Sequence, residues 1–145
     1  QAYGGGGMYN FYAMGTADNP RTPVVFVHEF GHSFAGLADE YFSSEVAYQD
    51  FYNLKYEPWE PNITTLVNFD AKWKDLLPTN TPIPTPLDDA HKDKAGVFEG
   101  GGYIAKGIYR PMDHCMMRDY APFCPACSRA ILQMIDYFTD KPIKH

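Results

Sequence analysis

The fold of this chain is decided by one stretch, Val24-Val25-Phe26-Val27-His28-Glu29-Phe30-Gly31-His32-Ser33-Phe34-Ala35-Gly36. Thr22 followed by Pro23 is a favourable N-cap and first-turn pair, so a helix is expected to begin there. Gly36 stands where helices commonly end with a residue in the left-handed conformation. Because the stretch opens with four apolar residues, it predicts a buried helix that ends near Gly36.

The same helix presents two histidines one turn apart. Residues i and i+4 of a helix lie about 40° apart around its axis, so the imidazoles of His28 and His32 can bind one metal ion, with Glu29 beside them. A buried pair of histidines needs a partner, and zinc is the natural one. The alternative interpretation is two ordinary histidines on a helix surface. We expect His28 and His32 to be zinc ligands.

A catalytic zinc needs a third protein ligand and keeps one position for water. Two carboxylates, Asp39 and Glu40, follow the glycine that turns the chain after the helix. We expect Asp39 to be the third ligand, with Glu40 as the alternative. Either side chain would otherwise be a surface carboxylate or a hydrogen-bonded support for a ligand.

Length and composition limit the class of protein. The 145 residues suit a single domain with a sizeable core. The net charge of −6 and the lack of a Lys/Arg cluster disfavour a nucleic-acid surface, and no apolar run approaches the length of a membrane span. Twelve glycines and twelve prolines indicate many loops, whereas three cysteines are too few for a disulfide-stapled miniprotein.

Four further elements are predicted from residue patterns. A flexible glycine run at 4–7 precedes a strand at 8–14, and a short helix is expected at 68–77. Residues 103–110 favour a strand, and residues 125–138 a helix. The expected buried stripe of that last helix consists of Ala130, Ile131, Met134, Ile135 and Phe138.

The string HEFGHSFAGLADEY at residues 28–41 resembles the metzincin zinc signature, because Gly36 precedes Asp39 by the same interval as in that signature. One extra residue between His32 and the glycine departs from it. Together with HCMMR at 114–118 and FCPAC at 123–127, the string resembles the bacterial IgA-metallopeptidase family. The resemblance extends through 73–77, 81–85 and 98–111, and so covers most of residues 3–138.

The resemblance implies an α+β fold, a metzincin-like zincin catalytic domain. Such a domain has a mixed sheet, an active-site helix, and a loop-rich lower half with a Met-turn and a C-terminal helix. Met117 is the expected Met-turn residue, with Met116 as the alternative. Residues 1–145 would form a single zinc metallopeptidase domain that lacks its N-terminal strands and helix, since 27 residues precede His28.

The implied function is zinc-dependent endopeptidase activity with one catalytic zinc ion. Glu29 would act as the general base that accepts the proton of the attacking water. Tyr120 is the expected hydrogen-bond donor to the oxyanion, with Tyr41 and Tyr109 as weaker candidates. The alternative function is a zinc-stabilised, non-catalytic protein-binding module, which would have no need of Glu29.

The expected partner is a protein or peptide substrate, added as a strand to a sheet edge near residues 3–14. A second expected partner is an N-terminal segment of the same precursor. The resemblance implies a secreted, cell-surface or periplasmic bacterial protein.

The three cysteines allow three arrangements. In an exported protein, one disulfide and one leftover thiol among Cys115, Cys124 and Cys127 is the favoured arrangement. With His114 the same cysteines make a formal Cys₃His zinc set. Three buried, reduced thiols are the remaining arrangement.

Overall fold

The structure is a computed structural model that describes residues 4–42 and 51–140. It is an α+β fold with three helices and two two-stranded antiparallel sheets among the described residues. No helix in these two ranges is long and apolar enough to cross a membrane. The elements in chain order are β1 (Gly5–Met8), β2 (Tyr12–Gly15), α1 (Thr22–Ala35), β3 (Phe98–Gly101), β4 (Ile104–Arg110), α2 (Met116–Asp119) and α3 (Pro125–Phe138).

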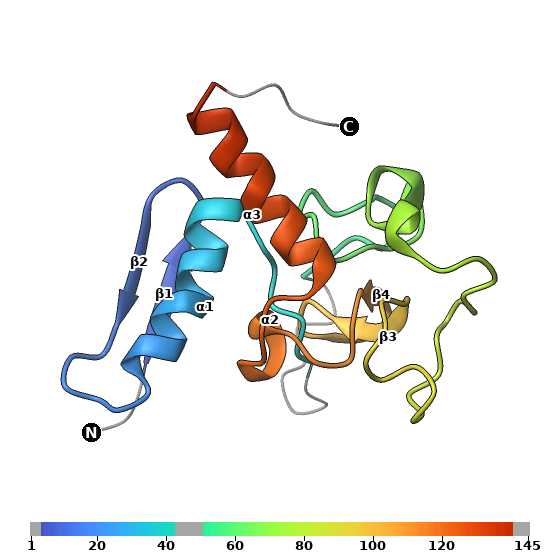
Figure 1. The fold of residues 1–145 in the computed structure, drawn as a ribbon, viewed down its shortest axis with the longest axis horizontal. Helices are drawn as coiled ribbons and strands as arrows, with labels where there is room; N and C mark the ends of the chain where they lie inside the picture. Colours follow the sequence, from blue (N-terminus) through green and yellow to red (C-terminus); the bar gives the residue numbers. More distant parts are fainter. Residues whose placement is uncertain (1–3, 43–50, 141–145) are drawn as a thin grey trace.

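A hairpin of β1 and β2 packs along α1 (Figure 1). Its antiparallel register runs from Gly5 opposite Gly15 to Met8 opposite Tyr12. The single strand expected at 8–14 is therefore wrong in its bounds, because the glycine run itself forms β1. Asn10, with φ of 56°, lies in the turn that divides the expected strand. Glycine is favoured at positions 5 and 7 of β1, because there the strand lies so close to α1 that an added Cβ would collide with Glu29.

The predicted helix is confirmed in its position as α1, from Thr22 to Ala35, but it is wrong as a buried helix, since Phe26 and Val27 are 47% and 39% exposed and Val25 alone of the apolar run is buried. Gly36 ends it in the left-handed conformation with φ of 62°, and its N–H donates to the carbonyl of His32 at 3.1 Å. The N-terminus differs from the expectation by one residue. Arg21 is the N-cap, and Thr22 already belongs to the helix. This ending at Gly36 turns the chain back towards the histidines.

The helix expected at 68–77 is replaced by two 3₁₀ turns, Phe69–Ala71 and Lys74–Leu76. Helical geometry is interrupted at Lys72, whose buried ammonium donates to the carbonyls of Pro58 and Glu60. The Trp73 indole is fully buried and donates to the carbonyl of Gly96 at 2.8 Å. These long-range bonds take precedence over local helix propensity.

The second sheet pairs β3 with β4, and a bulge lies between Glu99 and Gly101. The strand expected at 103–110 is thereby confirmed, starting one residue later. The mixed sheet that the resemblance implied is not found among the described residues. One isolated parallel bridge, between Phe42 and Tyr103, joins the chain that follows Asp39 to the start of β4. That bridge brings Tyr103 close to the end of α1.

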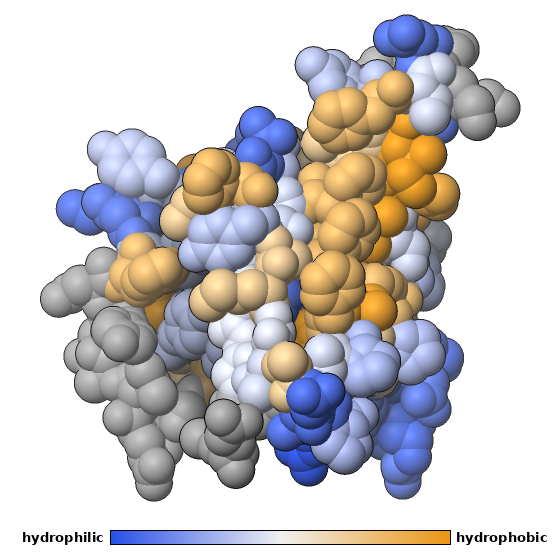
Figure 2. All heavy atoms as spheres, turned by 90° about the vertical axis from the view of Figure 1, so that its left-hand side faces the viewer, coloured by the Kyte–Doolittle hydropathy of each residue, from blue (hydrophilic) through white to orange (hydrophobic). Residues whose placement is uncertain are grey.

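The helix predicted at 125–138 is confirmed as α3, but its buried stripe is only partly right. Ala130 is buried, and Ile131 and Met134 pack on the core. Ile135 and Phe138 are 40% and 59% exposed, because the C-terminal half of α3 projects beyond α1 (Figure 1). The Phe138 ring stacks on Phe34 of α1. Figure 2 shows that apolar side chains gather on the side of the molecule that lies to the left in Figure 1.

The main core lies where α1, α2 and α3 meet the loop that carries Trp73. Three of its members are Cys115, Cys124 and Cys127, all buried and all free thiols. The predicted disulfide is therefore wrong. The Cys₃His set is also wrong, since His114 is more than half exposed and hydrogen-bonds with Asp119. The expectation that the domain has further N-terminal strands and a helix stays a prediction.

Candidate metal centre

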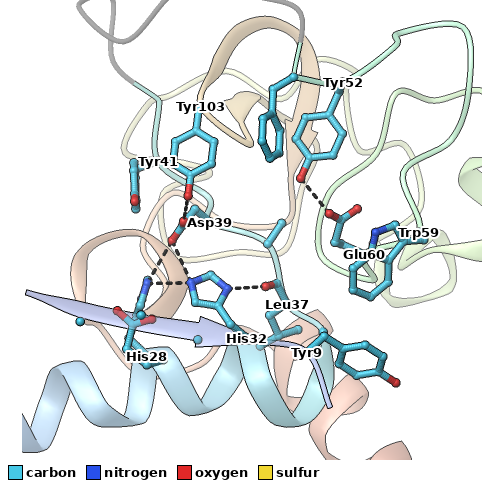
Figure 3. A pocket seen from close by; sticks show the side chains of 17 residues that line it. Tyr9, His28, His32, Leu37, Asp39, Tyr41, Tyr52, Trp59, Glu60 and Tyr103 are labelled. Carbon is cyan, nitrogen blue, oxygen red and sulfur yellow. Dashed lines mark hydrogen bonds and ion pairs between the residues drawn. The ribbon is translucent and has the colours of Figure 1, made fainter. Parts of the chain in front are cut away.

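Helix α1 directs His28, Glu29 and His32 towards one cavity, and the turn at Gly36 brings Asp39 to the same place (Figure 3). The Oδ1 atom of Asp39 lies 3.0 Å from Nε2 of His28 and 3.2 Å from Nε2 of His32. The two Nε2 atoms lie 3.1 Å apart. Three potential ligand atoms thus form a triangle with nearly equal edges.

The other nitrogen of each imidazole fixes the protonation of the ring. Nδ1 of His28 contacts the carbonyl oxygen of Met116 at 2.8 Å, and Nδ1 of His32 contacts that of Leu37 at 2.6 Å. A carbonyl oxygen only accepts hydrogen bonds, so each Nδ1 carries a proton and Nε2 is the nitrogen of each ring that can offer a lone pair to a cation. Two lone pairs and a carboxylate oxygen therefore converge on one point, and this arrangement favours a cation.

The triangle has the size of three ligands around zinc. Tetrahedral zinc with bonds of about 2.0 to 2.1 Å has ligand edges of about 3.3 Å. Asp39 Oδ1 is buried, and its short contacts with Nε2 of His28 and Nε2 of His32 are ones that a metal ion between the three atoms would replace. His28, His32 and Asp39 therefore fit a zinc ion, and three protein ligands leave one position for water.

The charges of the site reinforce one another. Burial acts to raise the pKa of Asp39, but the contacts of its carboxylate with His28 and His32 and the hydrogen bond from Tyr103 hold it well below its usual range. Burial acts to lower the pKa of His32, and the adjacent Asp39 carboxylate raises it above its usual value. Asp39 is consequently ionised and ready to bind a cation.

Glu29 lies between α1 and β1, beside the histidine pair. Its carboxylate is so close to β1 that a Cβ added to Gly5 would lie 2.6 Å from Oε1. Burial raises the pKa of Glu29, whereas a cation bound at the neighbouring imidazoles would lower it. Glycine at position 5 therefore determines where the Glu29 carboxylate can sit.

The cavity has a volume of about 390 Å³. It lies between β1, the end of α1, the segment 36–41 that follows this helix, and residues of the segment 51–60. Tyr52 donates a hydrogen bond to Glu60 at 2.8 Å across one wall (Figure 3). Its walls are rich in aromatic side chains, namely Tyr9, Tyr41, Phe51, Tyr52, Trp59 and Tyr103. The cavity can hold part of a peptide next to the metal centre.

The structure separates the two candidates for the third ligand. Asp39 faces the histidines, whereas the fully buried Glu40 points away from them towards the cysteines and accepts a hydrogen bond from Asn62. The two adjacent side chains thus contact groups on different sides of the segment that follows α1. The geometry favours Asp39 as the third ligand.

The three candidate tyrosines occupy different surroundings. The Tyr120 ring lies 5.5 Å from the His28 ring, outside the cavity lining, so its role at the oxyanion stays a prediction. Tyr41 lines the cavity, and burial together with the charge of Asp39 raises its pKa to about 12. Tyr109 packs against the core instead.

The two methionines lie directly behind the histidine helix. Met117 is fully buried, and its sulfur lies so close to Gly31 of α1 that an added Cβ there would be 2.8 Å away. The preceding residue, Met116, supplies the carbonyl that orients His28. This placement agrees with the role expected of Met117, which stays a prediction.

Tyr103 also belongs to the site, although no sequence pattern indicates it. Its hydroxyl donates a hydrogen bond to Oδ2 of Asp39, which leaves Oδ1 free to face the histidines. Tyr103 and Asp39 are 64 positions apart in the chain. The glycine triplet before Tyr103 marks the entry to a strand, but no local pattern links that strand to Asp39.

Comparison with protein families identifies a match over most of the chain. A model of the family described as IgA Peptidase M64 matches residues 1–95 and 87–135. No match was found among curated proteins. The matched residues include α1, Asp39, Tyr103 and all three cysteines.

Proposed function

Since this chain belongs to the IgA peptidase M64 family, it carries a peptidase domain, and we propose that it is a zinc-dependent endopeptidase. The proposal assigns the zinc to His28, His32 and Asp39. One observation carries it: three electron-rich atoms lie within 3.2 Å of one another beside the Glu29 carboxylate, at a cavity of peptide size.

When bound, zinc lowers the pKa of a coordinated water and polarises the carbonyl of the scissile peptide bond. Glu29 accepts a proton from the water as its oxygen attacks the carbonyl carbon. Glu29 then returns that proton to the leaving amine as the C–N bond breaks. Tyr103 holds Asp39 in place through Oδ2, and the carbonyls of Met116 and Leu37 hold the histidine rings.

The proposed substrate is an extended peptide that pairs with the main chain of β1. Gly5, Gly6 and Gly7 of this strand line the cavity, and among the described residues β1 pairs with β2 alone. An added strand would place its backbone next to Glu29 and its side chains against the aromatic walls. The family description mentions IgA, so immunoglobulin peptides belong in a cleavage screen beside a general peptide library.

The test is the variant Glu29→Gln, which keeps the shape of the side chain and removes its basicity. We expect kcat to fall by a factor on the order of 10² to 10⁴ while the zinc content stays unchanged. The matched control is Glu99→Gln, because Glu99 pairs with Lys106 on the surface, away from the cavity. Retained turnover in Glu29→Gln would place the base elsewhere.

The same screen decides between the peptidase and the alternative, a zinc-stabilised module that binds a protein without cutting it. A zinc-loaded wild-type chain that binds peptides and releases no fragments would favour the module. The Glu29 carboxylate beside the ligand triangle favours the enzyme, because a binding module has no use for a base at that point. Location outside the cytoplasm stays a proposal that rests on the family alone.

A further inference from the structure

A second group of metal-binding side chains lies behind Asp39, on the side away from the cavity. It consists of Glu40, Cys115, Cys124 and Cys127, all of them buried. Glu40 follows Asp39, Cys115 precedes α2, Cys124 caps the N-terminus of α3, and Cys127 lies in the first turn of that helix. Three separate segments of the chain therefore meet at one point. Two of them supply one ligand atom each, and the start of α3 supplies two.

The spacing of these atoms is that of a tetrahedral site. All four potential ligand atoms lie within 4.8 Å of one another. The sulfurs of Cys115 and Cys127 lie 3.7 Å apart, and Oε1 of Glu40 lies 3.2 Å from the sulfur of Cys127. Zinc with Zn–S bonds of about 2.3 Å has S···S edges of about 3.8 Å, so the cluster already has the required size.

Hydrogen bonds satisfy only one of the two carboxylate oxygens of Glu40 among the described residues. Its side chain is completely buried, and while Oε1 accepts a hydrogen bond from Asn62 at 2.9 Å, Oε2 has no hydrogen-bond partner among the described residues. A buried carboxylate oxygen without a partner is unfavourable unless a cation or a hydrogen-bond donor compensates it. A metal ion at the cysteines would provide that compensation.

The surroundings are suited to thiolates. The backbone N–H groups of Cys124 and Cys127 donate to the sulfurs of Cys115 and Cys124, each at 3.4 Å. Both donors belong to the N-terminal turn of α3, where the helix dipole favours negative charge. The buried guanidinium of Arg110 adds positive charge near Glu40. Three thiolates and a carboxylate around one divalent cation are thus partly neutralised by the protein itself.

We propose that Glu40, Cys115, Cys124 and Cys127 bind a second zinc ion, in a closed structural site. Soft thiolate ligands in a tetrahedral arrangement select zinc over magnesium or calcium. On binding, the three thiols release their protons to solvent, and no electrons are transferred. With four protein ligands and no exposed surface, the site has no position for substrate.

This second zinc ion would stabilise the positions of residues in the catalytic centre, from the side opposite the cavity. Glu40 is bonded in sequence to Asp39, and its N–H donates to the carbonyl of Met117 at 2.8 Å. Cys115 is bonded in sequence to Met116, whose carbonyl orients His28. Asp39 and Met116, which both contribute to the histidine site, are therefore each adjacent in sequence to a proposed ligand of the second zinc ion.

The test counts and identifies the zinc ions in chains purified without added metal. We expect two zinc ions per wild-type chain and one in the double variant His28→Ala/His32→Ala, measured by elemental analysis. X-ray absorption at the zinc edge of that double variant should show three sulfur neighbours at about 2.3 Å. Because the variant lacks the histidine site, this signal is independent of the proposed peptidase function.

Matched variants assign the ligands. Glu40→Gln should weaken retention of the sulfur-bound zinc against a chelator, whereas Glu60→Gln, at another buried carboxylate, should retain both ions. If Glu40→Gln fails to fold, the absorption spectrum of the double variant still decides. A double variant without zinc, a zinc spectrum without sulfur neighbours, or alkylation of only one cysteine in the unreduced, denatured wild type would each overturn the proposal.

Discussion

Substitution of Gly5 by alanine tests how the position of the Glu29 carboxylate controls catalysis. The added methyl carbon would lie 2.6 Å from Oε1 of Glu29, which is about 0.8 Å closer than ordinary van der Waals contact at 3.4 Å. It would also lie 3.0 Å from Cγ1 of Val25. The carboxylate is the mobile end of a side chain, so it can move away at little cost in folding free energy.

We expect this displacement to reduce kcat rather than stability. A misplacement of about 1 Å in a catalytic group can cost a factor of about 10² in rate, so Gly5→Ala should lower kcat by about 10-fold to 100-fold. The assay is peptide hydrolysis by zinc-loaded protein, with zinc content and thermal unfolding measured on the same samples. Zinc content should not change, since Glu29 is not assigned as a ligand.

The matched control is Gly4→Ala, directly before β1 and outside the cavity lining. An added methyl carbon there would meet no atom within 4 Å, so kcat should stay within about 2-fold of wild type. Wild-type kcat in Gly5→Ala, or equal losses in both variants, would refute the placement of Glu29 against β1.

Two further changes test other parts of the account. Tyr103→Phe removes the hydroxyl that donates to Asp39, a hydrogen bond to a charged group worth about 1.5–3 kcal/mol, so zinc affinity measured by chelator competition should fall by about 10-fold to 100-fold. Tyr56→Phe, at an exposed tyrosine, is its control, and equal affinities would contradict the role of Tyr103. Trp73→Ala removes a fully buried indole and should lower the free energy of unfolding by about 3–5 kcal/mol in denaturant titration, whereas a loss below about 1 kcal/mol would show that this side chain is not central to the core.

The parts of the site that lie on one helix could be predicted from the sequence. The spacing of His28 and His32, the start near Pro23 and the ending at Gly36 are local features, and the structure has all three. The choice between Asp39 and Glu40 needed the direction of each side chain. That direction depends on the path of the chain after Gly36, which residue spacing alone does not specify.

The features that the sequence did not reveal depend on distant contacts. Tyr103 reaches Asp39 through a strand that begins far along the chain, and Glu40 meets Cys127 across 87 positions. The expected helix at 68–77 gave way because Lys72 and Trp73 bond to distant carbonyls. In each case a tertiary hydrogen bond or a buried contact decides the structure, and local propensity has no information about either.

The most direct test of the central claim is anomalous X-ray diffraction at the zinc edge on crystals of the wild-type chain. We expect an anomalous peak within bonding distance, about 2.0–2.2 Å, of Nε2 of His28, Nε2 of His32 and Oδ1 of Asp39. A crystal of zinc-loaded protein with no peak between these three atoms, or with zinc bound there by Glu40 in place of Asp39, would contradict it.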